Sequence, residues 1–217
     1  MNNVDIVVLA DEYEYSKGGW INRNRLIINK KIEYVSIPLV SAPDYLRIYE
    51  RQISNTFDPR KILNKCSISY VRSSNFARGN ELMEKIFLEN NRDLFSFLLN
   101  SIHQICKYLE IKAKIVSLSD ISNDKSLKGQ DRVLDICKTL EASNYLNPEG
   151  GRELYKAEAF DQVGVKLEFL EHIPMSYGQL LPEFVPRLSV LDLIYMIESD
   201  EALQLHLNSC QIVKAKE

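Results

Sequence analysis

Residues 4–10 read Val-Asp-Ile-Val-Val-Leu-Ala, and this short run decides the fold class. It is rich in β-branched residues and almost continuously apolar, which is typical of a strand buried on both faces of a parallel sheet. Parallel strands need crossover connections, so the run predicts strands that alternate with helices. An inner strand also needs a neighbour on each edge, and an uncovered apolar edge would favour self-association into a homo-oligomer.

The remainder of the chain continues this alternation. Strands are expected at 25–29 and 32–39, paired as a hairpin around Asn29-Lys30-Lys31, and at 66–71, 113–118, 143–146 and 165–170. Helices are expected at 80–109, as one or two segments, and at 130–140, 151–160 and 189–206. We predict an α/β fold: a three-layer, mainly parallel sheet with an N-terminal β-hairpin insertion and helices on both faces. No repeat or linker divides residues 1–217, so a single domain is expected.

Composition and charge narrow the class of protein. The chain is 45% hydrophobic and 26% charged, like an ordinary globular protein, and its net charge of −3 provides no basic field for nucleic acid. No run of about eighteen apolar residues suits a membrane span, and the start lacks the features of a secretory signal. The four cysteines form no CxxC pair and fit a reducing compartment. We expect a cytoplasmic protein with no membrane insertion and no nucleic-acid partner.

Several familiar enzyme signatures are missing from the sequence. There is no HExxH, GxGxxG or Walker loop, and no Ser-His-Asp order or Cys-His pair. His103, His172 and His206 stand apart, and neither histidines nor cysteines cluster at metal-ligand spacing. Ser189 and Asp192 match the first residues of a capped helix and are interpreted as caps. We predict no metal and no tightly held cofactor.

The densest polar motif is Gly-Gly-Trp-Ile-Asn-Arg-Asn-Arg, residues 18–25. In an extended segment, Asn22 and Asn24 point to one side while Arg23 and Arg25 point to the other. Two neighbouring guanidinium groups favour an anion between them, because arginine binds planar oxyanions bidentately. The predicted ligand-binding residues of this motif are Trp20, Asn22, Arg23, Asn24 and Arg25.

Two acids, Asp11 and Glu12, directly follow the first strand. Ligands of open α/β sheets bind beyond the carboxyl ends of the strands, so we predict that Asp11 or Glu12 is a catalytic base. In the alternative interpretation Asp11, Glu12 and Glu14 neutralise the arginines of the 18–25 motif as a structural network.

Two later loops supply further candidates. Residues 147–152, Asn-Pro-Glu-Gly-Gly-Arg, run from an expected strand into an expected helix, where free backbone N–H groups can bind phosphate. The turn at 177–179, Tyr-Gly-Gln, can contact sugar hydroxyls. With the start of the preceding helix, these loops give the predicted ligand-binding residues Lys128, Arg132, Gly150, Gly151, Arg152, Tyr177 and Gln179. The alternatives are an ordinary tight turn at 147–152 and a solvated first helical turn at Lys128 and Arg132.

Three stretches of the sequence resemble the WbqC-like family. Residues 7–39 (VVLADEYEYSKGGWINRNRLIINKKIEYVSIPL) carry the specific match, and 129–155 (GQDRVLDICKTLEASNYLNPEGGRELY) and 177–195 (YGQLLPEFVPRLSVLDLIY) extend it over nearly the whole chain. The resemblance implies a bacterial protein of O-antigen, lipopolysaccharide or other surface-polysaccharide biosynthesis. It therefore implies a transferase for acyl or aminoacyl groups that acts on a nucleotide-linked amino sugar, with a small anionic ligand: a nucleotide sugar or an activated acyl donor.

One departure from the family pattern leaves an alternative open. Family members usually begin with a further strand and a turn that carries Gln-Pro and several aromatic residues, and Met1 lies after that point here. If that turn lines the active site, the chain is expected to bind a ligand without catalysing a reaction. The alternative function is a noncatalytic binding or assembly subunit of the same pathway.

Overall fold

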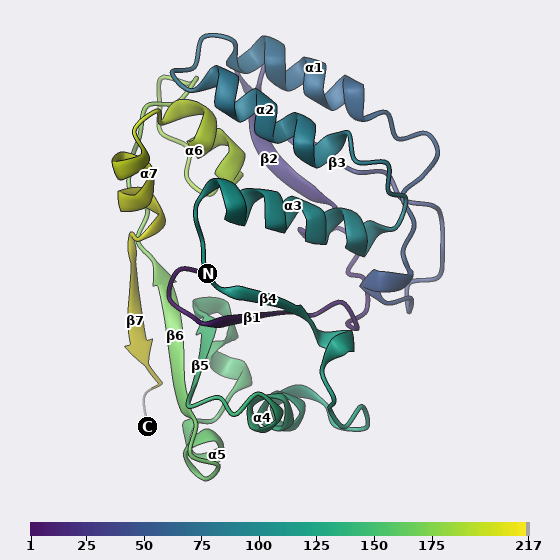
Figure 1. Ribbon diagram of the computed structural model, residues 1–217, viewed down its shortest axis with the longest axis vertical. Coiled ribbons are helices and arrows are strands. Elements are labelled where there is room, and N and C mark those ends of the chain that lie inside the picture. Colours follow the sequence, from purple (N-terminus) through teal and green to yellow (C-terminus); the bar gives the residue numbers. More distant parts are fainter. Residues whose placement is uncertain (216–217) are drawn as a thin grey trace.

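The computed structural model describes residues 1–215 as a mixed α/β protein with three small sheets (Figure 1). The strands are β1 (Ile6–Leu9), β2 (Arg23–Ile28), β3 (Lys31–Ser36), β4 (Lys114–Ser117), β5 (Asn144–Pro148), β6 (Lys166–His172) and β7 (Cys210–Lys214). The α-helices are α1 (Pro59–Tyr70), α2 (Phe76–Phe87), α3 (Leu94–Tyr108), α4 (Gly129–Thr139), α5 (Ala157–Asp161), α6 (Val190–Met196) and α7 (Asp200–Leu207). Short 3-10 helices are η1 (Ile48–Glu50), η2 (Leu118–Asp120) and η3 (Glu149–Leu154).

Parallel pairing brings β1 beside β4 and β5 beside β6, and β7 joins β6 antiparallel. β2 and β3 pair antiparallel across Asn29 and Lys30, whose φ angles of 51° and 59° suit a tight hairpin turn. The structure therefore differs from the expected continuous sheet. Among residues 1–215, β1 pairs with β4 alone, and its four residues are half-buried rather than buried on both faces.

The hydrophobic core is divided in the same way as the sheets. Its largest part joins α1, α2, α3 and α6 to β2, and includes Tyr70, Met83 and Tyr195. A second part gathers β6 residues around Phe160, and a third places Val8 and Val116 of the β1–β4 pair against the Ile136 side of α4. In Figure 1 the β1–β4 pair lies between α3 and α4, so helices flank the parallel strands whose ends carry the candidate site.

The predicted strand at 66–71 is wrong, because these residues end helix α1. The alternation of Cys66, Ile68 and Tyr70 with serines imitates a strand, but the helical signals lie upstream. Asp58 accepts a hydrogen bond from the backbone N–H of Arg60 and Pro59 occupies the first turn, which is a strong helix start. From there, Cys66 and Tyr70 fall on the buried helical face.

Two predicted helices are interrupted in the structure. The segment predicted at 151–160 consists of η3 and α5, and the segment predicted at 189–206 consists of α6 and α7, with Ser199 capping α7. Strand β7 was not predicted, because it lies mostly exposed at the edge of its sheet and its short sequence carries no strong strand pattern. Across residues 1–215, no helix combines the length and apolar character that crossing a membrane requires.

Candidate functional site

A cleft of about 460 Å³ opens at the carboxyl ends of the parallel strands β1 and β4. The loop after β1 contributes Asp11 and Glu12, and the turn after β4 contributes Ser119 and Asp120. The start of α3 forms another part of the wall, and Lys125 from the loop before α4 completes the cleft. Carboxyl ends of parallel strands are the usual ligand-binding edge of α/β proteins, so this cleft is the candidate site.

Asp11 is held rigidly with one carboxylate oxygen available. The residue is 2% exposed, and its Oδ1 accepts a 3.0 Å hydrogen bond from the backbone N–H of Ser119. Its backbone is fixed as well, because its carbonyl accepts from the N–H of Tyr49 at 3.2 Å. Within residues 1–215, no group donates to Oδ2. The sequence predicted Asp11 as a catalytic residue. In the structure this residue is almost completely buried, and its Oδ2 has no hydrogen-bond donor among the described residues.

Glu12 is bound by two cations. Lys125 Nζ donates to Oε1 at 2.6 Å, and Arg132 Nη2 donates to Oε2. Arg132 is fixed in turn by a 3.0 Å hydrogen bond from its Nε to Oδ1 of Asn123. The hydrogen bond from Lys125 lowers the pKa of Glu12 below its usual range; desolvation opposes this effect, and Arg132 reinforces it. A carboxylate kept ionised in this way is a weak base, so Asp11 is the better candidate for accepting a proton.

The cleft carries an excess of negative charge. Besides Asp11 and Glu12, Asp93 and Asp120 line it, and Lys125 is the cation among the described lining residues. Asp93 also caps α3, where its Oδ1 accepts from the N–H of Ser96 at 2.7 Å. In the described part of the chain, no three acids, histidines or cysteines are arranged to hold a metal ion. Such a cleft favours a cationic group such as an ammonium over a bare phosphate.

The 18–25 motif lies outside this cleft, and its two arginines bind backbone carbonyls. Arg23 Nε donates to the Gly19 carbonyl at 2.9 Å, and its guanidinium lies 4.8 Å from the ring centre of Tyr34. Arg25 Nη2 donates to the carbonyls of Pro186 and Arg187, at 3.1 and 2.8 Å. Among residues 1–215, no acid forms an ion pair with either arginine. The interpretation of Asp11, Glu12 and Glu14 as partners of these arginines is therefore wrong, because Arg23 binds the turn at 18–19 and Arg25 binds the loop at 186–187. The Nε of Arg25 is buried without a hydrogen-bond partner in the described residues.

The asparagines of the motif have local structural partners. Asn22 accepts a 2.8 Å hydrogen bond from the hydroxyl of Tyr15 and donates a 2.8 Å bond to the carbonyl of Ile37. Asn24 accepts from the backbone N–H of Arg25. Trp20 differs, because it is 59% exposed, with its ring centre 5.9 Å from that of Tyr34. An aromatic surface suitable for stacking on a base or sugar therefore remains at Trp20.

The structure brings one of the later candidates, Arg132, to the acids after β1. Arg152 pairs with Glu171 and lies over the ring of Phe169, so its charge is already compensated. Gly151 is packed, since an added Cβ would lie 2.0 Å from the side-chain nitrogen of Asn147. Gly150 is open, and Lys128 is exposed at the start of α4.

The turn at 177–179 is a structural element. Tyr177 donates a 2.7 Å hydrogen bond to Oδ2 of Asp192, and Gln179 bonds the N–H and the carbonyl of Val185. Tyr70 donates to the other oxygen of Asp192 at 2.5 Å. Ser189 caps α6 as predicted, but the Asp192 side chain binds two tyrosine hydroxyls.

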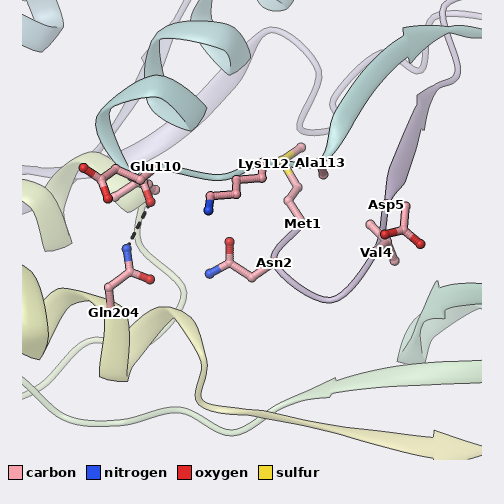
Figure 2. A pocket seen from close by; sticks show the side chains of 9 residues that line it. Met1, Asn2, Val4, Asp5, Glu110, Lys112, Ala113 and Gln204 are labelled. Atoms are coloured by element: carbon pink, nitrogen blue, oxygen red, sulfur yellow. Dashed lines mark hydrogen bonds between the residues drawn. The ribbon is translucent and has the colours of Figure 1, made fainter.

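A second cavity, of about 500 Å³, lies at the amino ends of β1 and β4 (Figure 2). Asn2, Asp5, Lys112 and Gln204 line it, and Gln204 donates a 3.0 Å hydrogen bond to the carbonyl of Leu109. The amino edge of parallel strands is seldom a ligand-binding edge. We therefore place the candidate site at the carboxyl end.

Sequence reasoning missed most of the cleft lining, including Asp93, Ser119, Asp120 and Lys125. The position of Asp93 just before an amphipathic helix can be recognised in the sequence, but it predicts only the start of that helix and gives no information about a ligand. Ser119 contributes through its backbone N–H, which no residue pattern reveals. Lys125 reaches Glu12 across 113 positions, a proximity that depends on the tertiary fold.

The fold and the cleft define a mixed α/β protein with an acidic cleft at the carboxyl end of a parallel strand pair. Comparison with known proteins identifies the family within this class. The chain belongs to the WbqC-like protein family, whose family model matches residues 1–204. It is also 23% identical over 202 residues to the uncharacterised protein Rv1507c of Mycobacterium tuberculosis (strain ATCC 25618 / H37Rv), across 91% of this chain and 86% of that protein. No solved structure gave a significant match.

Proposed function

We propose that the protein is a transferase that joins an acyl or aminoacyl group to the amine of a nucleotide-linked amino sugar in surface-polysaccharide biosynthesis. The observation that carries the proposal is the buried Asp11 carboxylate, with one oxygen unpartnered, in the cleft at the strand ends. The family resemblance supports the pathway, and the negative charge of the cleft supports an amine as the group that enters it.

Asp11 supplies the base that such a reaction needs. The amine attacks the carbonyl carbon of an activated acyl donor, so a nitrogen–carbon bond forms and the bond from that carbon to the leaving group breaks. Before the attack, the bound ammonium loses one proton to Asp11 and becomes the nucleophilic amine. The leaving group keeps the electron pair of the broken bond and takes the second proton, which nitrogen loses as the amide forms. Glu12, held ionised by Lys125 and Arg132, stabilises positive charge at the amine.

Ligand contacts outside the cleft are proposed at the exposed parts of the predicted motifs. Trp20 offers an aromatic face for the base or sugar of a nucleotide sugar. Lys128 is exposed at the start of α4, and Gly150 leaves backbone open at η3. The other side chains predicted to bind a ligand already form hydrogen bonds or ion pairs within the protein. They could bind a ligand only if these internal bonds were replaced by bonds to the ligand.

Product formation tests the function directly. The purified protein would be incubated with nucleotide-linked amino sugars and thioester or aminoacyl donors, and products would be identified by mass spectrometry. Asp11→Asn keeps an oxygen that can accept from Ser119, so it should fold normally and lose product formation. Glu14→Gln, which changes an acid of the same loop outside the cleft, is the matched control and should retain activity. Equal activity of the wild type and Asp11→Asn would contradict the role of Asp11.

A second candidate function is a noncatalytic binding or assembly subunit. The observation that favours it is the composition of the cleft, whose described lining residues include no histidine and no cysteine. Binding of a nucleotide-linked amino sugar without product formation, across all donors, would support this function over a transferase.

A further inference from the structure

Lys125 places a primary ammonium inside the candidate site. Its Nζ lies 2.6 Å from Oε1 of Glu12, and the residue lines the cleft beside Asp11. We infer that Lys125 is a built-in competitor: its ammonium occupies the position of a ligand amine beside Glu12 and leaves when that ligand binds. This inference rests on the proposed function in its choice of an amine as the ligand.

The negative charge of Glu12 stays compensated without Lys125. The carboxylate binds Arg132 through its other oxygen, and the Arg132 side chain is 12% exposed and further held by Asn123. Lys125 is bound much less firmly, because its side chain is 58% exposed and, within residues 1–215, Glu12 is the one partner of its ammonium. The Glu12 side chain is 2% exposed, but Arg132 still pairs with it when Lys125 moves away, so the charge of the buried carboxylate stays compensated and the movement costs little.

A free amine gains a contact that Lys125 lacks. Asp11 is 2% exposed, and no described residue donates to its Oδ2. Oδ2 is accessible from the cleft, so it can accept a hydrogen bond from a ligand that enters there. An ammonium carries three N–H donors, so a ligand amine can bind Asp11 and Glu12 together. This contact with Oδ2 of Asp11 gives the ligand amine an advantage over the lysine that it replaces, because Lys125 binds Glu12 but not Asp11.

The opposite role for Lys125 would be to bind an anionic group of the ligand. The two roles predict opposite effects of removing its charge. A competitor that is removed makes amine binding tighter, whereas an anion-binding residue that is removed makes phosphate binding weaker.

The experiment compares three probes that differ by single groups: glucosamine, glucose and glucose 1-phosphate. Each is titrated into 15N-labelled wild-type protein and into Lys125→Met, and the amide signal of Ser119, the donor to Asp11, reports binding. Lys138→Met, which changes an exposed lysine in the last turn of α4 outside the cleft, is the matched control. Melting temperatures of all variants check that the fold is retained.

We expect Lys125→Met to bind glucosamine about two- to fivefold more tightly than the wild type, the size of effect typical of an exposed ion pair. Glucose should bind equally weakly to both, Lys138→Met should behave like the wild type, and Asp11→Asn should lose the preference for glucosamine over glucose. Unchanged, weaker or undetectable glucosamine binding by Lys125→Met would overturn the inference, as would a selective loss of glucose 1-phosphate. Tighter amine binding without any transferase product would uphold the inference and contradict the proposed function.

Discussion

The backbone N–H of Ser119 donates a 3.0 Å hydrogen bond to Oδ1 of Asp11, which ties the loop after β1 to the turn after β4. One buried carboxylate thereby joins two strand ends 108 positions apart in the chain and fixes the base of the cleft. The stability and the chemistry of the site therefore depend on the same side chain.

Substitutions of Asp11 should separate these two roles. Asp11→Asn keeps the acceptor for Ser119, so the free energy of unfolding should change by less than about 1 kcal/mol. Asp11→Ala leaves the Ser119 N–H unpaired and should cost about 1–3 kcal/mol. Urea unfolding measures both values. Equal destabilisation by the two variants would mean that the hydrogen bond to Ser119 does not hold the strand ends.

The contacts of Glu12 with Lys125 and Arg132 should make stability depend on pH. The contacts of Glu12 lower its pKa in the folded state, so their contribution is complete above the ordinary glutamate pKa and is lost as pH falls through the lowered value. Arg132→Met should cost about 2–3 kcal/mol at neutral pH, whereas Lys125→Met should cost less than about 1 kcal/mol. Unfolding curves at neutral and acidic pH measure the loss of unfolding free energy in each variant. A greater loss in Lys125→Met than in Arg132→Met would contradict this prediction.

Arg25 should matter more for stability than Arg23. Arg25 joins β2 to the loop before α6, through its bonds to Pro186 and Arg187, whereas Arg23 binds the nearby turn at 18–19. We expect Arg25→Ala to lower the free energy of unfolding by about 1.5–3 kcal/mol and Arg23→Ala by less than about 1.5 kcal/mol. Chemical denaturation of both variants provides the test; a larger effect at Arg23 would refute it.

Gly79 in α2 should tolerate no side chain. A Cβ built there lies 2.5 Å from Cδ1 of Tyr195, whose side chain is fully buried. Gly79→Ala should therefore cost about 1–3 kcal/mol through overpacking, despite the better helix propensity of alanine. Gly150→Ala is the control, because no atom lies within 4 Å of its added Cβ. Comparable melting temperatures for the two variants would argue against close packing of Gly79 on Tyr195.

Asp192 should give stability a second, opposite dependence on pH. Burial raises its pKa above the usual aspartate range, although hydrogen bonds from Tyr70 and Tyr177 oppose this shift. An acid with a raised folded pKa binds its proton more tightly when folded, so its contribution decreases as pH rises from about 4 through the raised value. Asp192→Asn should remove this decrease. Stability measured from pH 4 to 8 in both proteins checks it, and parallel curves would show that Asp192 does not cause the dependence.

Residue patterns within a few positions of one another correctly predicted a strand, a hairpin turn and two acids of the cleft. The apolar run at 4–10 gave β1, Asn29 and Lys30 gave the turn of the hairpin, and the placement of acids after β1 indicated Asp11 and Glu12. The 66–71 segment failed because its alternation matched a strand, while the helix start eight positions earlier determined its structure.

The sequence by itself determined the alternation of strands and helices, the family, and the position of two acids at a strand end, because each follows from residues close together in the chain. Tertiary structure alone decided the division into three sheets and the partners of Arg25 and Glu12. Arg25 binds a loop more than 160 positions away, and Glu12 binds Lys125 and Arg132. The physical reason is that a guanidinium or a carboxylate can bind many different partners with similar energy. Which partner it binds therefore depends on which group the packing of the chain brings within reach.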